Sequence, residues 1–190
     1  MTILHLLRKR ARALMECGSV GDTLRAVAGY RQEPNAALGM HGHLRVTRAD
    51  GSLLFKGGNK VVYAGLEDIV DKLQGAGNIN TYKYVGFGLG TTASADSDTT
   101  LESEITGGTY ARLTGTQGEG DNAREYRVSG TWTNTSGATR AGTEYGLFSA
   151  ATDGTMLCHV TTGDTSPPDL KTVAVNETIT IQWDIQLQDA

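Results

Sequence analysis

Polar and apolar residues alternate most regularly near the C-terminus of the chain. Between Thr178 and Leu187 every second residue is apolar, and threonine, glutamine or aspartate stands between; the apolar positions are Ile179, Ile181, Trp183, Ile185 and Leu187. Side chains of a β-strand point alternately to its two faces, so a period of two predicts a strand with one buried face and one solvated face.

Five further segments have the composition of strands and are separated by turns rich in Gly, Asn, Ser or Asp. They are Tyr84–Leu89, Tyr110–Thr116, Glu125–Thr133, Thr143–Ala150 and Met156–Thr162. The chain also holds 25 glycines, and its threonines are concentrated after Tyr82. Short strands at close spacing predict a mainly β fold, either an antiparallel β-sandwich or a jelly-roll-like domain.

A hairpin and one short helix are predicted before these strands. Leu44–Thr47 and Ser52–Phe55 flank Asp50-Gly51, a strong hairpin signal. Gly57-Gly58-Asn59 should then end the strand, with Asn59 capping a helix from about Val61 to Leu73. The helix should end at Gly75 and Gly77 and bury an apolar stripe formed by Val62, Leu66, Ile69, Val70 and Leu73.

The N-terminal segment Met1–Met15 has the apolar spacing of an amphipathic helix, with Leu4, Leu7, Ala11, Leu14 and Met15 on one face. The basic residues Arg8, Lys9, Arg10 and Arg12 follow the first apolar positions, whereas a signal peptide places its charges first, so we expect no export. Two interpretations stay open for this segment: an arm that docks on an acidic partner surface, or a solvated helix face. In the first, the contacts come from Leu4, Leu7, Arg8, Lys9, Arg10 and Arg12.

Residues Gly18–Met40 show no clear periodicity, and an irregular stretch of that length is uncommon inside a compact domain. We therefore expect residues 1–40 to form a helical and extended arm. Residues 41–190 should form a β-rich domain that includes the helix near residues 61–73.

Composition and charge exclude several classes of protein. The chain is 38% hydrophobic with a formal net charge of −4, as in ordinary globular proteins. Its mild acidity gives no reason to expect direct nucleic-acid binding. It contains no stretch of 18 apolar residues, so no membrane contact is expected.

The candidate sites for chemistry are weak. Gly86-Phe87-Gly88-Leu89-Gly90 lacks the spacing of a nucleotide-binding loop, and a glycine-rich strand packed closely against another element explains it better. His41 and His43 could share a face of a strand and bind a metal, but no third ligand is near and Gly39 and Gly42 suggest a turn. Cys17 and Cys158 are expected as buried reduced thiols, with a disulfide between them as the alternative.

Asp96–Glu104 carries Asp96, Asp98, Glu102 and Glu104 and could hold Ca²⁺, but a solvated loop is the expected outcome. A serine nucleophile motif of the GxSxG type is also missing from the sequence. We therefore expect no catalytic residue, no cofactor and no metal, and a protein that is not an enzyme.

Two motifs resemble a pattern found in small virion proteins of tailed bacteriophages. The first is the run from Tyr84 to Thr92 (YVGFGLGTT), and the second is Asp98–Ile105 (DTTLESEI). The closing run Asn176–Trp183 and the run from Gly58 to Leu66 are also similar to segments of such proteins. The likeness covers roughly Asn59 to Leu187 and carries no catalytic residues.

The resemblance implies a protein that is assembled in the host bacterial cytoplasm and resides in the virion. The first expectation is a capsid decoration (cement) protein that binds the major capsid protein. The alternative is a tail, neck or fibre component that contacts other virion proteins or a host glycan. A homo-oligomer is expected, with a trimer as the symmetry by analogy with decoration proteins and fibres.

Overall fold

The computed structural model describes residues 38–78, 81–106, 111–162 and 171–189. Residues 38–189 make up one compact unit. The expected arm contacts from Leu4 to Arg12 lie outside the described residues, as does Cys17. No helix in the described ranges is long and apolar enough to cross a membrane.

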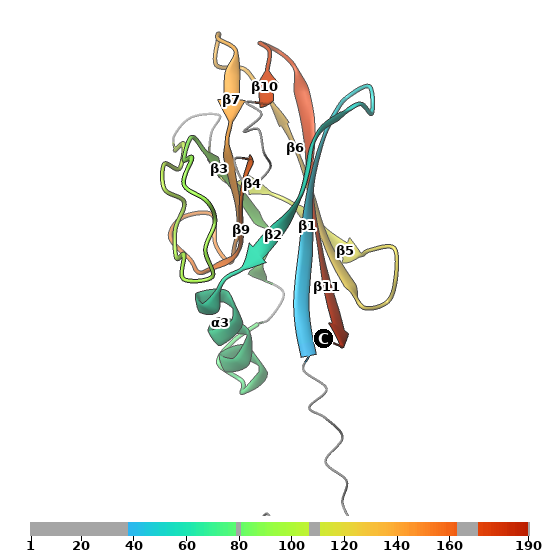
Figure 1. The fold of residues 1–190 in the computed structure, drawn as a ribbon, viewed down its shortest axis with the longest axis vertical. Coiled ribbons are helices and arrows are strands. Elements are labelled where there is room, and N and C mark those ends of the chain that lie inside the picture. The colour runs from blue at the N-terminus through green and yellow to red at the C-terminus, as the bar shows by residue number, and fades with distance from the viewer. Residues whose placement is uncertain (1–37, 79–80, 107–110, 163–170, 190) are drawn as a thin grey trace, which may run out of the picture. The chain divides into compact units, whose positions relative to one another are not determined.

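The described chain is mainly antiparallel β with one helix, as the sequence predicts (Figure 1). The elements in chain order are β1 (Leu38–Arg48), β2 (Leu53–Val61), α3 (Tyr63–Leu73), β3 (Tyr84–Gly88), β4 (Leu113–Thr114), β5 (Thr116–Glu119), β6 (Glu125–Thr133), β7 (Arg140–Gly142), β8 (Glu144–Phe148), β9 (Met156–Thr161), β10 (Lys171–Val173) and β11 (Thr178–Asp189). Nine strands form one sheet in the order β4-β3-β8-β9-β2-β1-β11-β6-β5, and β7 pairs with β10.

The large sheet is nearly closed into a barrel. Strand β2 pairs with β1 along Leu53–Asn59 and then with β9 through Lys60 and Val61, so it joins two halves of the sheet. The two outermost strands, β4 and β5, belong to one continuous segment that pairs first with β3 and then with β6.

Gly115 is the corner between β4 and β5. Its backbone N–H donates to Lys83 O at 2.7 Å, and a Cβ at this position would lie 2.5 Å from Val128 Cγ1. The segment can therefore cross from one half of the sheet to the other because a glycine stands at the crossing point.

The predicted alternation in the last strand is confirmed. Ile179, Ile181, Trp183 and Ile185 are buried in the core, while Leu187, near the end of β11, is 41% exposed. Trp183 is fully buried between β1 and β6, the two neighbours of β11. The apolar period of this strand thus supplies one wall of the barrel interior.

The first hairpin is longer than predicted. β1 begins at Leu38, three residues before the expected domain start, and the turn after it places Gly51 at φ +83°. His41 and His43 lie within β1 rather than in a turn and are exposed on the outer face. The suggestion of a turn around these histidines is wrong, because β1 pairs with β11 along its whole length.

Helix α3 differs from its prediction at its start and along its face. β2 continues through Gly57-Gly58-Asn59, and the helix is preceded by Val62, which makes no side-chain cap. The predicted stop is confirmed, since Gly75 has φ +96° just after the helix. The predicted buried stripe is wrong at Val70 and Leu73, which are 52% and 73% exposed.

Most of the other predicted strands are present with shifted bounds. The segment predicted as Tyr110–Thr116 forms β4 and the start of β5, and the segments predicted as Thr143–Ala150 and Met156–Thr162 contain β8 and β9. The short β7 and β10 were not expected, because three residues carry too little periodicity to predict a strand.

Candidate functional site

The two motifs that carry the phage resemblance lie side by side. Leu89 N donates to Ser103 O and Ile105 N donates to Phe87 O, both at 3.0 Å, and Gly88 forms a bridge with Glu104. The loop from Leu89 to Glu104 therefore leaves the end of β3 and returns to pair with the same strand. We call residues 89–104 the pinned loop.

The spaced glycines allow this return. A Cβ on Gly90 would lie 2.6 Å from Glu144 Cδ and 2.7 Å from Glu102 Cβ, and a Cβ on Gly88 would overlap Glu144 Oε1 and Ser103 O. The run was predicted to be a glycine-rich strand packed closely against another element. This prediction is confirmed, and the elements are the pinned loop and the side chain of Glu144.

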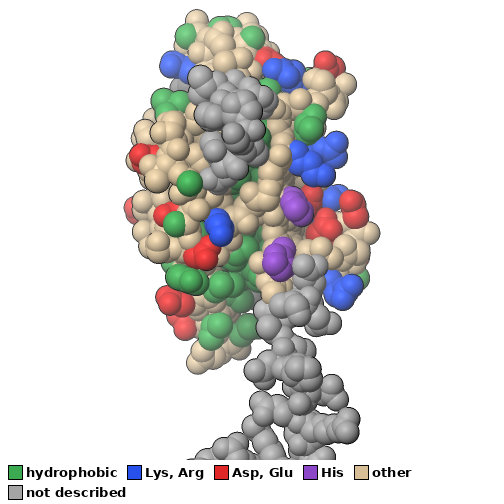
Figure 2. All heavy atoms as spheres, viewed as in Figure 1, with side chains coloured by type: hydrophobic (Ala, Val, Ile, Leu, Met, Phe, Trp, Pro, Cys, Tyr) green, Lys and Arg blue, Asp and Glu red, His purple; other side chains and the backbone are tan. Residues whose placement is uncertain are grey.

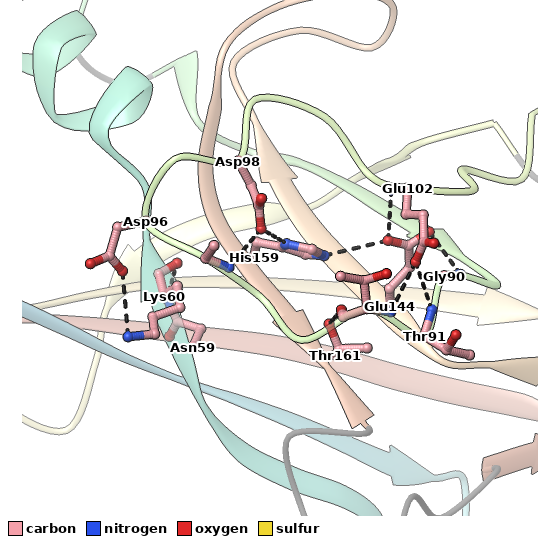
Figure 3. A network of polar contacts seen from close by, with 12 residues as sticks. Asn59, Lys60, Gly90, Thr91, Asp96, Asp98, Glu102, Glu144, His159 and Thr161 are labelled. Atoms are coloured by element: carbon pink, nitrogen blue, oxygen red, sulfur yellow. Dashed lines mark hydrogen bonds and ion pairs between the residues drawn. The ribbon is translucent and has the colours of Figure 1, made fainter.

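Glu144 is the centre of the site and is only 1% exposed. Its Oε1 accepts backbone N–H groups from Gly90 at 3.0 Å and Ser103 at 2.7 Å, and its Oε2 accepts the N–H of Glu102 at 2.9 Å (Figure 3). One carboxylate on β8 thus holds both ends of the pinned loop. Hydrogen bonds to an ionised acceptor are stronger than neutral ones.

His159, on the neighbouring strand β9, stands between two carboxylates. Its Nδ1 lies 2.7 Å from Asp98 Oδ2, and its Nε2 lies 3.4 Å from Glu144 Oε2 (Figure 3). The second contact is an ion pair without good hydrogen-bond geometry, because Nε2 has no hydrogen-bond partner among the described residues. His159 is 3% exposed and Glu144 is 1% exposed, so their contact is shielded from water, whereas the Asp98 side chain is 28% exposed.

Burial and the surrounding charges act in opposite directions on these groups. Burial disfavours the charged form of His159, but Glu144 and Asp98 outweigh it and raise the pKa of the imidazole. Burial likewise disfavours an ionised Glu144, but His159 and the three backbone N–H groups lower the pKa of its carboxyl. Both shifts favour the charged form of the residue concerned.

Two carboxylates within the pinned loop, those of Asp98 and Glu102, also accept hydrogen bonds from its own backbone. Asp98 Oδ2 also accepts the N–H of Ala95 at 2.7 Å. Glu102 Oε2 accepts the N–H groups of Thr91 at 2.8 Å and Thr92 at 2.9 Å, and these bonds lower the pKa of its carboxyl. The loop is thus closed on itself as well as tied to the barrel.

A second, partly buried charge pair anchors the segment that follows the loop. Arg112 Nε and Nη2 donate to the two carboxylate oxygens of Glu104 at 2.6 and 2.8 Å, and the guanidinium lies over the Phe148 ring at 3.4 Å. Arg112 Nη1 donates to Ala150 O at 3.1 Å. A bidentate pair of this kind fixes orientation as well as distance.

The acidic patch Asp96–Glu104 was expected to be a solvated loop, with calcium as the alternative. The solvated interpretation is wrong for Asp98 and Glu104, which are partly buried and bind His159 and Arg112, whereas Glu102 is exposed and also accepts backbone N–H groups. Asp96 makes a longer contact of 3.4 Å with Lys60. The described residues contain no group of three or more His, Cys, Asp or Glu side chains placed to hold a metal.

The remaining sequence candidates make no contact that builds this site, although Cys158 directly precedes His159 on β9. His41 and His43 project from β1, and Cys158 is a buried free thiol whose pKa is raised by burial. Sequence reasoning missed Glu144, His159 and Arg112. A signal did exist for the first two, since a charged or titratable residue stands in each of the fully buried strands β8 and β9.

A scan against protein-family models finds no match, and searches of curated proteins and of solved structures find none either.

The arrangement is suited to holding backbone in place. All the close polar contacts of Glu144 go to loop N–H groups and to His159, and its side chain is enclosed. A buried charge is tolerated when such contacts replace its hydration. The site therefore fastens the pinned loop on the outside of the barrel.

Proposed function

We propose that this chain is a non-enzymatic structural protein of a tailed-bacteriophage virion, where it serves as a capsid decoration (cement) protein. In this role the barrel sits on the shell, and its partner is the major capsid protein. A tail, neck or fibre component that contacts other virion proteins or a host glycan is the alternative. For the fold, we favour describing the two halves of the nearly closed sheet, joined at β2 and at Gly115, as the layers of a β-sandwich rather than as a jelly roll.

The observation that supports this proposal is the structural role of the two motifs that resemble those of small virion proteins. The glycines of the first motif and the carboxylates of the second, Asp98 and Glu102, are committed to fastening a loop. Polar groups that bind the backbone in this way fix the shape of the loop and make it rigid. Those are the properties required of a shell component that must present one fixed surface.

The N-terminal sequence supports an assembly role independently. Residues before Leu38 precede the compact unit and carry both an apolar set and a basic cluster (Leu4, Leu7, Arg8, Lys9, Arg10 and Arg12). Such a segment suits contact with other copies or with other virion proteins, in a homo-oligomer for which we propose a trimer. We propose no direct contact with nucleic acid or membrane.

Copy number in purified particles tests the proposal. Quantitative mass spectrometry of virions should find the protein at a ratio to the major capsid protein that matches a site repeated over the shell. A ratio near that of the tail or neck proteins would instead support the alternative role. Complete absence from purified particles would contradict both.

A further inference from the structure

Helix α3 carries an apolar stripe that the barrel does not cover. Tyr63, Val70 and Leu73 are 59%, 52% and 73% exposed, and Leu66 between them is only half-buried. These positions are spaced by three or four residues, so they lie on one face of the helix. An exposed contiguous apolar stripe of this kind marks an interaction surface.

The barrel leaves the stripe uncovered because a different side of α3 packs against it. Gly65 faces β9 so closely that a Cβ there would lie 2.5 Å from Leu157 Cα and 2.8 Å from Met156 O. On the neighbouring face Asp68 bonds Lys72 and the Tyr82 hydroxyl. The contact therefore uses Gly65, the partly buried Ile69 and polar groups, and it leaves Tyr63, Val70 and Leu73 exposed.

The polar residues beside the stripe are acidic. Glu67 and Asp71 are exposed on α3, and Figure 2 shows apolar and acidic side chains together at this end of the molecule. A partner that fits must therefore present an apolar face of helical spacing flanked by positive charge.

The chain itself contains a segment with these properties. The sequence of Met1–Met15 predicts a helix with Leu4, Leu7 and Leu14 on one face, and it carries the basic cluster Arg8–Arg12 with no acidic residue before Glu16. Apolar positions would meet the stripe, and arginines would meet Glu67 and Asp71. Both the spacing and the sign of charge are complementary.

The location of α3 makes this segment available to it. Antiparallel pairing sets Gly42 of β1 beside Asn59 of β2, so the start of β1 and the start of α3 lie at the same end of the barrel (Figure 1). Residues 16–37 connect Met15 to β1, and fully extended they reach about 70 Å at roughly 3.3 Å per residue. That length is enough to reach another copy.

We propose that the segment Met1–Met15 of a neighbouring copy docks on the α3 stripe formed by Tyr63, Leu66, Val70 and Leu73. Exchange of an identical terminal segment joins copies at low cost, since no new surface has to be created. The inference rests on the proposed multi-copy assembly but does not depend on the virion as its location.

Disulfide trapping of the purified full-length protein tests the exchange. In a Cys17→Ser background, with Cys158 left buried, a tagged Leu7→Cys protein is mixed with a Val70→Cys protein under mild oxidation. The expected product is a covalent heterodimer, at several times the yield of a Leu7→Cys and Thr131→Cys mixture. Thr131 is an exposed control on β6, where it pairs with Thr180 of β11 at the barrel end opposite α3. Adding Leu4→Asp to the Leu7→Cys protein should reduce the yield to the control level.

Each other outcome overturns the proposal. A yield no higher than that of the Thr131 control means that the segment does not dock on α3. A dominant Val70→Cys homodimer means that two α3 helices pair instead. A doubly substituted chain that closes only within itself means that no exchange between copies occurs. None of these readouts involves particles, so they are separable from the copy-number test.

Discussion

The backbone nitrogen of Gly90 donates to the buried carboxylate of Glu144 at 3.0 Å, and a Cβ on Gly90 would lie 2.6 Å from the carboxyl carbon. The two residues are 54 positions apart in the chain. The absence of a side chain at Gly90 permits the close approach, and the hydrogen bond to the Glu144 carboxylate stabilises it. Each is therefore required for the other, and each can be tested separately.

Gly90→Ala should destabilise the protein by about 1–3 kcal/mol, the usual cost of forcing an extra methyl group into a packed site. Urea denaturation followed by circular dichroism measures the change. Gly118→Ala is the matched control, because a Cβ on Gly118 meets no atom within 4 Å. Equal effects at the two positions would show that Glu144 does not pack against Gly90 as described.

Glu144→Gln should cost about 3–5 kcal/mol, since the buried His159 ring loses one of its two carboxylate partners and the single amide oxygen cannot accept all three loop N–H groups. The exposed Glu119→Gln should change the stability by less than about 0.5 kcal/mol. A double-mutant cycle with His159→Gln should give a coupling free energy of about 0.5–3 kcal/mol. A coupling near zero would mean that the two side chains do not interact.

Stability should depend on pH in two opposite ways. The pKa of folded His159 is raised above 6.5, so its contribution is complete below pH 6.5 and is lost as pH rises through the raised pKa. The pKa of folded Glu144 is lowered below 4.5, so its contribution is present above pH 4.5 and is lost as pH falls through the lowered pKa. Thermal melts across the pH range should therefore show greatest stability between about pH 4.5 and 6.5.

His159→Gln should flatten the loss of stability above pH 6.5, whereas His43→Gln, at an exposed position, should leave it unchanged. An unchanged alkaline limb in the His159 variant would assign the pH dependence to other groups.

The two faces of β11 should tolerate charge very differently. Ile181→Asp or Trp183→Asp places an unpaired carboxylate in the core, where both native side chains are fully buried, and should leave the protein unfolded or insoluble. Gln182→Asp, on the opposite face, should remain soluble with a small change in melting temperature. Soluble expression and melting of the three variants decide the matter, and similar tolerance on both faces would contradict the assignment.

Deleting Met1–Ala37 should leave a folded protein with an unchanged cooperative melt, because residues 38–189 form a compact unit. Under the proposed virion role, the truncated protein should fail to enter particles that the full-length protein is expected to enter. A truncated protein that does not fold would show that the N-terminal segment contributes to the core. Normal incorporation would place the binding surface on the barrel.

The parts of the fold that depend on local patterns were predictable. The alternation in β11 and the turn at Asp50-Gly51 were identified because neighbours in sequence determine them. The pinned loop was not, because Glu144 and His159 meet Asp98 and Gly90 only after distant strands pair. For α3 the apolar arc was visible, but its uncovered half depends on how closely Gly65 approaches β9, which the spacing of residues does not reveal.

The joining of β4 and β5 at Gly115 also bears on how the protein behaves when many copies lie close together. Strand edges are the usual route by which β-proteins stick to one another, through unpaired backbone groups that recruit a strand from the next molecule. Here the outermost strands of the nine-stranded sheet belong to one segment, and β4 has two residues and β5 has four. In the described part of the chain, the edges of the large sheet therefore offer few unpaired backbone N–H and C=O groups to a strand of a neighbouring molecule.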